Sequence, residues 1–427
     1  MTTELDPAAI DLRAILPRNA RIIWSHACGE PLTLIEALIA QRAVVGPVSV
    51  FASTSFSGVL KPEHLDFIRV SSMGALGSFR ALHAAGGVDV IPCHTAEIAP
   101  YIEQGLIGCD VAFVQVAPAG ADGRHSYGVI NDHIQAAVAT ARIVVAEVNA
   151  QVPQTDTGEF LDPARIDYLV RTDRPLVEVP SGAIGAEDRA IAEFATRYIA
   201  DGSTIQIGIG TVPDAIAQLV GDRRDLGVHS GMIGDSIGAL MRSGVVTNVR
   251  KPFDTGRTVT GALIGTRPLY DLGADTSLMA LRPTSYTSGD VLYRLPKLVT
   301  INSVIEVDLT GQVNAETIGD AYVGATGGQV DFVRAGSRSP GGHSILALRS
   351  TAVRGTVSRI RATLSGPVTT ARNDVDAIVT EHGVAELRGQ TLAERASRMI
   401  AIAHPAFREE LERSLHSEAK KGGALAS

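Results

Sequence analysis

The sequence predicts a two-domain α/β protein with mostly parallel sheets, and three observations support this fold class. The chain has 427 residues, whereas a domain usually has about 100–200 residues. Short β-branched runs alternate with helical patterns in both halves of the chain, which is typical of parallel sheets. Hydrophobic residues make up 45% and charged residues 20%, a composition that favours a globular protein over a disordered one.

The first half contains five runs that predict strands and three patterns that predict helices. The strands are expected at residues 21–24, 47–51, 88–91, 110–116 and 142–149, and the helices at 32–41, 96–104 and 131–140. Residues 150–180 hold four prolines among polar residues, and we interpret them as an excursion and a linker. A new helix at 186–198 follows, so we place one domain at 1–185 and the other at 186–427.

The second half repeats this alternation. Strands are expected at residues 204–209, 225–228, 298–301, 304–309, 344–348 and 377–380, and helices at 213–220, 233–242 and 392–402. Thr391 and Glu394 have the spacing of a capping box, so the last of these helices should begin there.

Composition excludes several function classes. The net charge of −8 argues against a nucleic-acid binder, which needs a basic face. No apolar run approaches the roughly 18 residues of a membrane span, and the N-terminus lacks the pattern of a secretory signal. Cys28, Cys93 and Cys109 have no metal-binding spacing and indicate a reducing compartment. We therefore expect a cytoplasmic protein that binds no nucleic acid, no membrane and no metal.

A glycine-containing turn follows the expected strand at 204–209. Its residues are Gly208, Ile209, Gly210, Thr211 and Val212. Thr211 is a candidate N-cap, and Asp214 completes a Thr-x-x-Asp box. Bare backbone beside a helix N-terminus suits a phosphate or an amide, although the same residues also form tight turns that bind nothing. The turn is not the Gly-x-Gly-x-x-Gly of dinucleotide-binding folds, so a dehydrogenase is not predicted.

A polar turn after the strand at 225–228 contains two titratable candidates. His229 is a candidate base, and Asp235 a candidate acid, because active residues gather at the carboxyl ends of parallel strands. Each also has a structural interpretation, since a lone histidine is often structural and an aspartate in a first helical turn often only complements the helix dipole.

Taken together and in this order, these segments resemble the acetyl-CoA hydrolase/4-hydroxybutyrate-type CoA-transferase family. The string INSVIEVDLTGQVNAE at 301–316 with GGQVDFVR at 327–334 is the most specific part, and SHACGEP at 25–31 and AEVN at 146–149 extend the likeness into the first half. The resemblance implies two tandem CoA-transferase-type α/β domains with the active site between them. It also implies coenzyme A or acyl-CoA as a substrate, a small carboxylate acceptor, no tightly bound cofactor, and a homodimer or homotetramer.

Several binding residues carry over from the family. Gly208 to Val212 match the turn that contacts coenzyme A. The positions that line the pantetheine and the thioester match Asn302, Gly327, Gly328 and Gln329. The family usually has a lysine shortly before its Ser-Arg pair. Here that position is Thr356, and Arg354 is the nearby candidate for the phosphate contact.

The catalytic position departs from the family. Its transferases have His-Thr-Glu-Met or a similar sequence, and their glutamate attacks the thioester and then carries coenzyme A as a glutamyl thioester. This chain has His229-Ser230-Gly231-Met232, so the glutamate position is a glycine.

Three interpretations of this departure remain open. A carboxylate elsewhere replaces the nucleophile, with Glu30, Glu97 and Asp235 as candidates. Alternatively, water hydrolyses the thioester, with Asp235 or His229 as base. The third interpretation is an acyl-CoA binding protein or sensor without catalysis. We expect an enzyme that moves coenzyme A between a short acyl group and a carboxylate, or that hydrolyses the thioester.

Overall fold

The computed structural model describes residues 2–424, and the side chains of residues 2–416. The first half forms an eight-stranded parallel sheet in the order β1-β8-β7-β6-β2-β3-β4-β5. Its strands are β1 (Thr3–Leu5), β2 (Arg21–Trp24), β3 (Val48–Phe51), β4 (Ile68–Ser72), β5 (Val88–Val90), β6 (Val111–Val116), β7 (Ile143–Asn149) and β8 (Tyr168–Thr172). Its helices are α1 (Leu12–Ile15), α2 (Leu32–Val45), α3 (Phe79–Ala84), α4 (Thr95–Glu103) and α5 (Ile134–Thr140), with short 3-10 turns at Pro62–His64 and Pro163–Arg165.

The second half forms another eight-stranded sheet, in the order β12-β11-β10-β9-β13-β18-β22-β23, in which only β23 is antiparallel to its neighbour. Its strands are β9 (Thr204–Ile207), β10 (Gly227–Ile233), β11 (Thr258–Leu263), β12 (Met279–Leu281), β13 (Leu298–Ser303), β18 (His343–Ala347), β22 (Ala377–Thr380) and β23 (Gly383–Glu386). Its helices are α6 (Ala186–Ala195), α7 (Thr211–Leu219), α8 (Asp235–Arg242), α9 (Arg267–Gly273), α10 (Thr284–Thr287), α11 (Gln329–Arg338), α12 (Leu392–Ala401) and α13 (Pro405–Ala424), with 3-10 turns at Thr196–Tyr198 and Asp290–Arg294.

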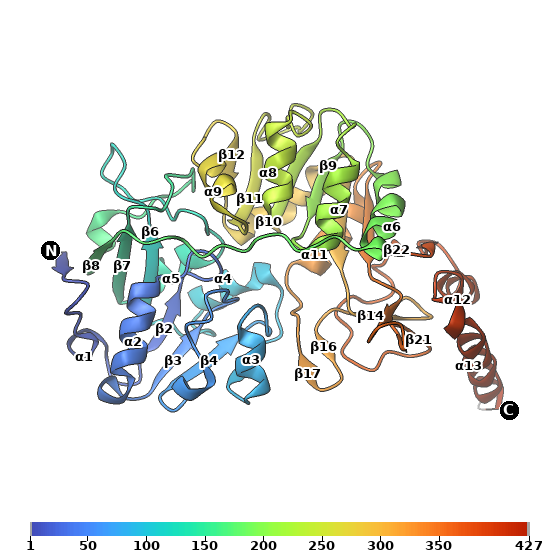
Figure 1. The fold of residues 1–427 in the computed structure, drawn as a ribbon, viewed down its shortest axis with the longest axis horizontal. Helices are drawn as coiled ribbons and strands as arrows, with labels where there is room; N and C mark the ends of the chain where they lie inside the picture. Colours follow the sequence, from blue (N-terminus) through green and yellow to red (C-terminus); the bar gives the residue numbers. More distant parts are fainter. Residues whose placement is uncertain (1, 425–427) are drawn as a thin grey trace.

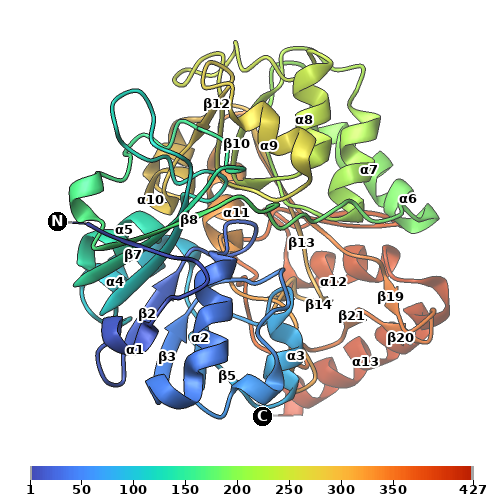
Figure 2. The ribbon, with the colours of Figure 1, turned by 60° about the vertical axis from the view of Figure 1, so that its left-hand side comes forward.

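Small strand pairs complete the second half. They are β14 (Glu306–Asp308) with β15 (Val313–Asn314) and β21 (Ile360–Arg361), β16 (Thr317–Ile318) with β17 (Ala321–Tyr322), and β19 (Thr351–Ala352) with β20 (Val357–Ser358). Figure 2 shows α12 and α13 beside the small strands. Val307 and Ile360 of these strands share an apolar cluster with Met399 of α12, which fixes the helix there.

The first sheet is covered by helices on both faces, and its central strand shows why. Along β6, Val111 and Phe113 pack into one apolar cluster, while Ala112, Val114 and Val116 pack into another on the opposite face. Side chains alternate across a strand, so a continuous apolar run such as this one requires cover on both sides. Figure 1 shows the extended segment that runs from β8 across the molecule to α6 and so joins the two sheets.

The two halves are held together by a shared piece of sheet. Residues 129–131 of the first half lie antiparallel to β11 of the second, through the Ile130–Ala262 bridge. The amide N–H of Asn131 donates to the carbonyl of Gly261 at 2.9 Å, and that of Leu263 donates to the carbonyl of Val129 at 2.9 Å. Ala27, Cys28, Val129 and Ile130 belong to the same buried cluster as the second sheet. The halves therefore share one of the buried apolar clusters.

The predicted fold class is confirmed, as is the capping box, in which the Thr391 side chain accepts from the backbone N–H of Glu394. The linker interpretation of 150–180 is wrong in part, because β8 lies inside that segment and pairs with β7. The expected strand at 225–228 is too short, since β10 continues to Ile233 along its neighbour β11. The N-cap of α7 is Gly210 and not Thr211, whose side chain makes no capping bond.

Elements between 253 and 338 were also missed, among them β11, α10 and the helix α11 that begins directly after Gly328. Within residues 2–424, every helix is too short or too polar to span a bilayer.

The shared sheet segment yields a test of stability. Asn131 is fully buried, and its side-chain amide donates to the carbonyls of Thr157 at 2.8 Å and Leu281 at 3.0 Å. Asn131→Ala removes these two bonds and the one that its side-chain oxygen accepts from Gln135 at 2.6 Å, and each such bond contributes about 0.5–1.5 kcal/mol. We expect urea unfolding to show a loss of about 2 kcal/mol. Gln218→Ala, on an exposed helix position, is the control, and an equal effect of both substitutions would contradict the role of Asn131.

Candidate functional site

Three neighbouring parallel strands bring the predicted binding residues to one edge of the second sheet. Gly231 lies in β10, Gly208 directly follows β9, and Asn302 lies near the end of β13. The strands β10, β9 and β13 are adjacent in the sheet. The carboxyl ends of parallel strands meet at the same edge, where α/β proteins usually bind ligands. Asn302 is held there by a reciprocal amide pair with Gln206, at 3.1 and 3.2 Å.

The turn after β9 leaves its backbone uncovered. Among the described residues, nothing lies within 4 Å of where a Cβ would stand on Gly208 or Gly210. Gly210 has a φ of 120°, a conformation that favours glycine. Thr211 begins α7, so the helix fixes this end of the turn. The turn is therefore anchored at its helical end and open at its glycines.

The Gly327–Gln329 segment connects this edge to the first half. Gly327 has a φ of 58°, and its carbonyl accepts a hydrogen bond from the backbone N–H of Thr95 at 3.0 Å. The Gln329 side chain donates to the Thr370 hydroxyl at 2.8 Å. One turn further along α11, the Phe332 ring lies against both Gly328 and Gly231. The structure thus brings Gly231 and the Gly327–Gln329 segment together around one aromatic ring.

Nothing in the backbone of position 231 requires a glycine. Gly231 has no positive φ, and an added Cβ would lie 3.6 Å from the Phe332 ring, which is ordinary contact. Gly261, on the neighbouring strand β11, is different, because a Cβ there would approach the Gly231 carbonyl oxygen to 2.9 Å. A side chain could therefore stand at 231 but not at 261.

His229 is enclosed by aromatic rings and by the sheet. It is fully buried, and its Nε2 lies 3.3 Å from the backbone carbonyl of Tyr286. Burial, with a smaller effect of Lys251, lowers the pKa of His229 to about 4. The ring is therefore neutral at physiological pH and held by a backbone carbonyl.

Asp235 and Glu30 both have their carboxylates engaged. Asp235 accepts from the backbone N–H of Thr266 at 3.1 Å and from its hydroxyl at 3.0 Å, which ties α8 to the start of α9. Glu30 accepts from the Ser55 hydroxyl at 2.7 Å and from the backbone N–H groups of Phe56 and Ser57. Burial raises the pKa of Glu30 in spite of these bonds. Each side chain holds a loop in place.

Of the other residues considered from the sequence, Glu97 and Arg354 are exposed, and the three cysteines have poorly reactive thiols. Glu97 is exposed in the first turn of α4, and Arg354 is exposed at the tip of the β19–β20 hairpin. Burial raises the pKa of the thiols to about 12, 11 and 12 for Cys28, Cys93 and Cys109. Few thiolates are then present at neutral pH.

Comparison with known proteins identifies the family. The model of the acetyl-CoA hydrolase/transferase N-terminal domain matches residues 8–180, and that of the C-terminal domain matches residues 265–415. The chain belongs to the acetyl-CoA hydrolase/transferase family. Coenzyme A transfer or thioester hydrolysis is the activity class of this family, as the sequence predicted.

Individual members of the acetyl-CoA hydrolase/transferase family align along nearly the whole chain. A 4-hydroxybutyrate coenzyme A transferase from Clostridium kluyveri is 37% identical over 401 residues, which are 93% of this chain and 94% of that protein. A solved 4-hydroxybutyrate CoA-transferase from Porphyromonas gingivalis superposes with a TM-score of 0.82 at 32% identity, covering 97% of this chain and 98% of that one. RipA from Yersinia pestis superposes with a TM-score of 0.91 at 30% identity, covering 98% of each chain.

One cluster of titratable side chains was not singled out from the sequence. His26, Asp132 and His133 are all buried, and their ligating atoms lie within 4.8 Å of one another. His26 follows β2, whereas Asp132 and His133 directly precede α5. His26 and Asp132 are 106 residues apart in the chain. His26 does lie in the segment that resembles the family, but no local pattern pairs it with Asp132.

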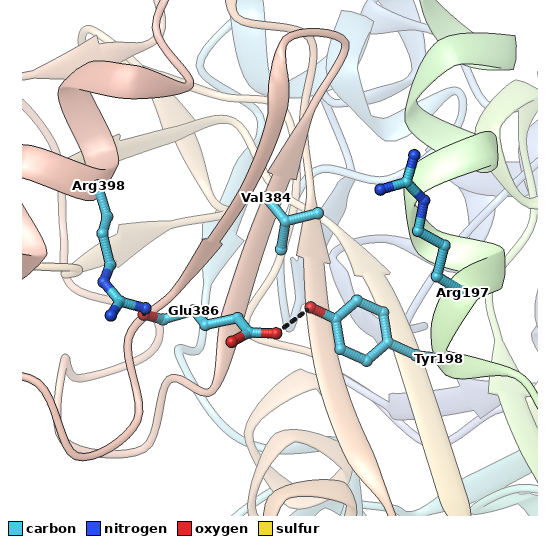
Figure 3. A pocket seen from close by; sticks show the side chains of 5 residues that line it. All are labelled: Arg197, Tyr198, Val384, Glu386 and Arg398. Atoms are coloured by element: carbon cyan, nitrogen blue, oxygen red, sulfur yellow. Dashed lines mark hydrogen bonds between the residues drawn. The ribbon is translucent and has the colours of Figure 1, made fainter.

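A surface hollow of about 420 Å³ lies elsewhere, at the edge strand β23. Its lining residues are Arg197, Tyr198, Val384, Glu386 and Arg398. The Tyr198 hydroxyl donates to Glu386 at 2.8 Å across this hollow (Figure 3). Because β23 is four positions from β9 in the sheet, the hollow is separate from the strand ends that carry the predicted site.

The open turn after β9 yields a binding test. Gly208→Val adds bulk over the bare backbone without strain, because Gly208 has no positive φ and no near neighbour. If the turn contacts acyl-CoA, the KM should rise at least ~10-fold, which corresponds to ~1.4 kcal/mol. Steady-state thiol release measures this.

Gly221→Val is the matched control, since Gly221 is exposed, has no positive φ and lies at the opposite end of α7. An unchanged KM in a folded Gly208→Val variant would place the substrate elsewhere.

Proposed function

We propose that this protein hydrolyses short acyl-CoA thioesters, with water as the attacking group. The observation that carries the proposal is Gly231, which has no side chain at the position of the family's nucleophilic glutamate. Water attacks the thioester carbonyl, the C–S bond breaks, and a carboxylate and the free thiol of coenzyme A are released. Preorganised donors for the developing oxyanion contribute about 3–4 kcal/mol each to such a step.

A relocated nucleophile is less well supported by the contacts. A carboxylate nucleophile needs a free oxygen, and both Glu30 and Asp235 have their oxygens in hydrogen bonds that hold loops. Glu97 is exposed rather than at the strand ends. A water molecule needs no free carboxylate oxygen to attack the thioester. It requires only space beside the carbonyl carbon and a base that accepts its proton.

We expect the adenine-nucleotide end of acyl-CoA to contact Arg349 and Arg359, which lie just before β19 and just after β20, rather than Arg354 at the tip of that hairpin. Arg349 donates to Asp188 at 2.8 Å, and the Asp188 carboxylate lies near Thr211 of the glycine turn. Arg359 is more than half buried, and burial followed by the nearby Arg349 lowers its pKa. Arg349 is already paired with Asp188, so Arg359 supplies the phosphate contact and Arg349 adds only its nearby charge.

Other parts of the proposal rest on the family resemblance. Acyl-CoA is a substrate and not a tightly bound cofactor, and a small carboxylate is the product or, in a residual transfer reaction, the acceptor. We propose a homodimer or homotetramer, with domains 1–185 and 186–427, that works in the cytoplasm without nucleic acid, membrane or metal. Sedimentation analysis distinguishes the two oligomers.

Restoring the missing side chain tests the proposal. Wild type should release thiol from acetyl-, propionyl- or butyryl-CoA at a rate that added acetate or succinate does not raise. Gly231→Glu should raise transfer relative to hydrolysis about 10-fold or more, equivalent to about 1.4 kcal/mol, because a Cβ at position 231 makes only ordinary contact with the Phe332 ring. Gly231→Gln is the matched control, which fills the same space without a nucleophile.

Intact-mass analysis after acyl-CoA treatment and borohydride reduction separates the alternatives. Wild type should carry no adduct, whereas an adduct on Glu30, Glu97 or Asp235 would establish a relocated nucleophile. Tight binding of acyl-CoA with neither adduct nor thiol release would favour the binding protein.

The phosphate contact has its own test. Arg359→Met should raise the KM for acyl-CoA by about 10–100-fold, because a hydrogen bond to a charged group contributes about 1.5–3 kcal/mol. The KM for the corresponding acyl-pantetheine, which lacks the nucleotide, should not change. Arg354→Met is the control at the exposed hairpin tip, and equal effects on both substrates would assign Arg359 a structural role instead.

A further inference from the structure

The cluster of His26, Asp132 and His133 lies at the junction of the two halves, close to Gly231. Asn131, the residue before Asp132, is hydrogen bonded to Gly261 of β11, and Gly261 lies beside Gly231 of β10. Two strand spacings of about 4.8 Å therefore separate the backbone at 131 from that at 231, roughly 10 Å in all. The cluster is thus next to the position where the family places its nucleophile.

Asp132 organises the cluster by contacting both histidines. One of its oxygens, Oδ2, is hydrogen bonded to Nε2 of His26. The other oxygen accepts the backbone N–H of His133 at 2.5 Å and lies 3.1 Å from Nδ1 of the same residue. The two imidazole rings are stacked, with centroids 4.9 Å apart and planes 10° from parallel. His26 is therefore fixed by a carboxylate at one nitrogen and by a ring on one face.

The second nitrogen of His26 has no partner. The side chains of His26 and Asp132 are 8% and 9% exposed, and Nδ1 of His26 makes no hydrogen bond to any described residue. Burial alone would raise the pKa of Asp132, but the two imidazoles outweigh it and hold that pKa well below its usual value. Asp132 accepts a hydrogen bond from Nε2 of His26, so Nδ1 is the ring nitrogen that faces no described protein group.

Two buried hydroxyl groups without described partners, those of Thr284 and Thr287, lie on α10 at the same junction. The helix α10 bridges the two positions, since the backbone N–H of Thr284 donates to the Asp132 carbonyl at 3.1 Å and the Thr287 hydroxyl lies beside Gly261. Both hydroxyls are buried, and neither bonds to another described side chain or backbone group. A buried polar atom left unsatisfied costs about 1–3 kcal/mol, so each of these atoms favours a bound water or a polar ligand group.

A metal ion suits the cluster less well than water. Two imidazoles that bind one ion direct their in-plane lone pairs to a single point, whereas stacked rings only 10° from parallel direct theirs along separate planes. The nitrogen of His26 nearest to Asp132 is also already hydrogen bonded to it.

We propose that His26, oriented by Asp132, is the general base that activates the attacking water for thioester hydrolysis at Gly231. This inference rests on the proposed hydrolase function. Nδ1 of His26 accepts a proton as the water oxygen bonds to the thioester carbon. When the C–S bond breaks, the same proton passes to the leaving sulfur, so His26 returns to its starting state. The Thr284 and Thr287 hydroxyls hold the water between the base and the substrate.

His26→Gln tests this role, because its amide N–H can still donate to Asp132 but cannot take a proton. We expect kcat for thiol release to fall about 10²–10⁴-fold, the usual contribution of a general base, with the KM for acyl-CoA and the melting temperature nearly unchanged. His343→Gln is the control, because His343 stands at the start of β18, at the edge of the sheet opposite to the site, and its kcat should not change. Added imidazole should restore part of the rate to His26→Ala and none to Asp132→Ala.

The possible outcomes distinguish the hydrolase function from the role of His26 as its base. If wild type hydrolyses acyl-CoA and His26→Gln does so at the same rate, the base is another group and the hydrolase function stands. If wild type releases no thiol, both proposals fail. If His26→Gln does not fold, imidazole rescue of His26→Ala decides, and a folded His26→Ala that imidazole leaves inactive overturns the base. One bound equivalent of zinc or iron, with activity lost to a chelator, would overturn it in favour of a metal site.

Discussion

The antiparallel pairing of residues 129–131 with β11 is the constraint on which the rest of the site depends. Two backbone hydrogen bonds, each of 2.9 Å, make a segment of the first half part of the second sheet. Because this pairing is buried in a core common to both halves, it fixes the position of Asp132 relative to Gly231 with the precision of a sheet. If the two domains were only loosely docked, side-chain contacts alone would set the position of Asp132 relative to Gly231.

The same pairing explains an asymmetry between two neighbouring glycines. Gly261 sits where a Cβ would meet the Gly231 carbonyl, so its size is a requirement of the packed strands. Gly231 faces only the Phe332 ring at ordinary contact distance, so its size is not required by packing. Under the proposed function, Gly231 stands where the family has its nucleophile, and because packing does not require a glycine there, its small size is a chemical difference that leaves room for a water molecule.

Much of this site could be predicted from sequence because it depends on local patterns. The β-branched run of β9 and the glycines after it predicted the turn at Gly208, and strand adjacency then placed it beside Gly231. The full length of β10 was missed because Ser230 and Gly231 have weak strand propensity and are held by pairing with β11. His26 and Asp132 were not paired because 106 residues separate them, and only the tertiary fold joins them.

Coenzyme A transfer and thioester hydrolysis place different geometric requirements on an active site built on the same fold. A covalent nucleophile must be placed within bonding distance of the carbonyl, and everything else on the acceptor side must stay open for an incoming carboxylate. Hydrolysis instead requires that one small molecule be held in a fixed orientation, which a buried polar cluster achieves better than an open one. His26, Asp132 and the α10 hydroxyls are buried and contributed by both halves. The junction that joins the halves therefore has the polarity and the enclosure that a bound water needs, two strands away from Gly231.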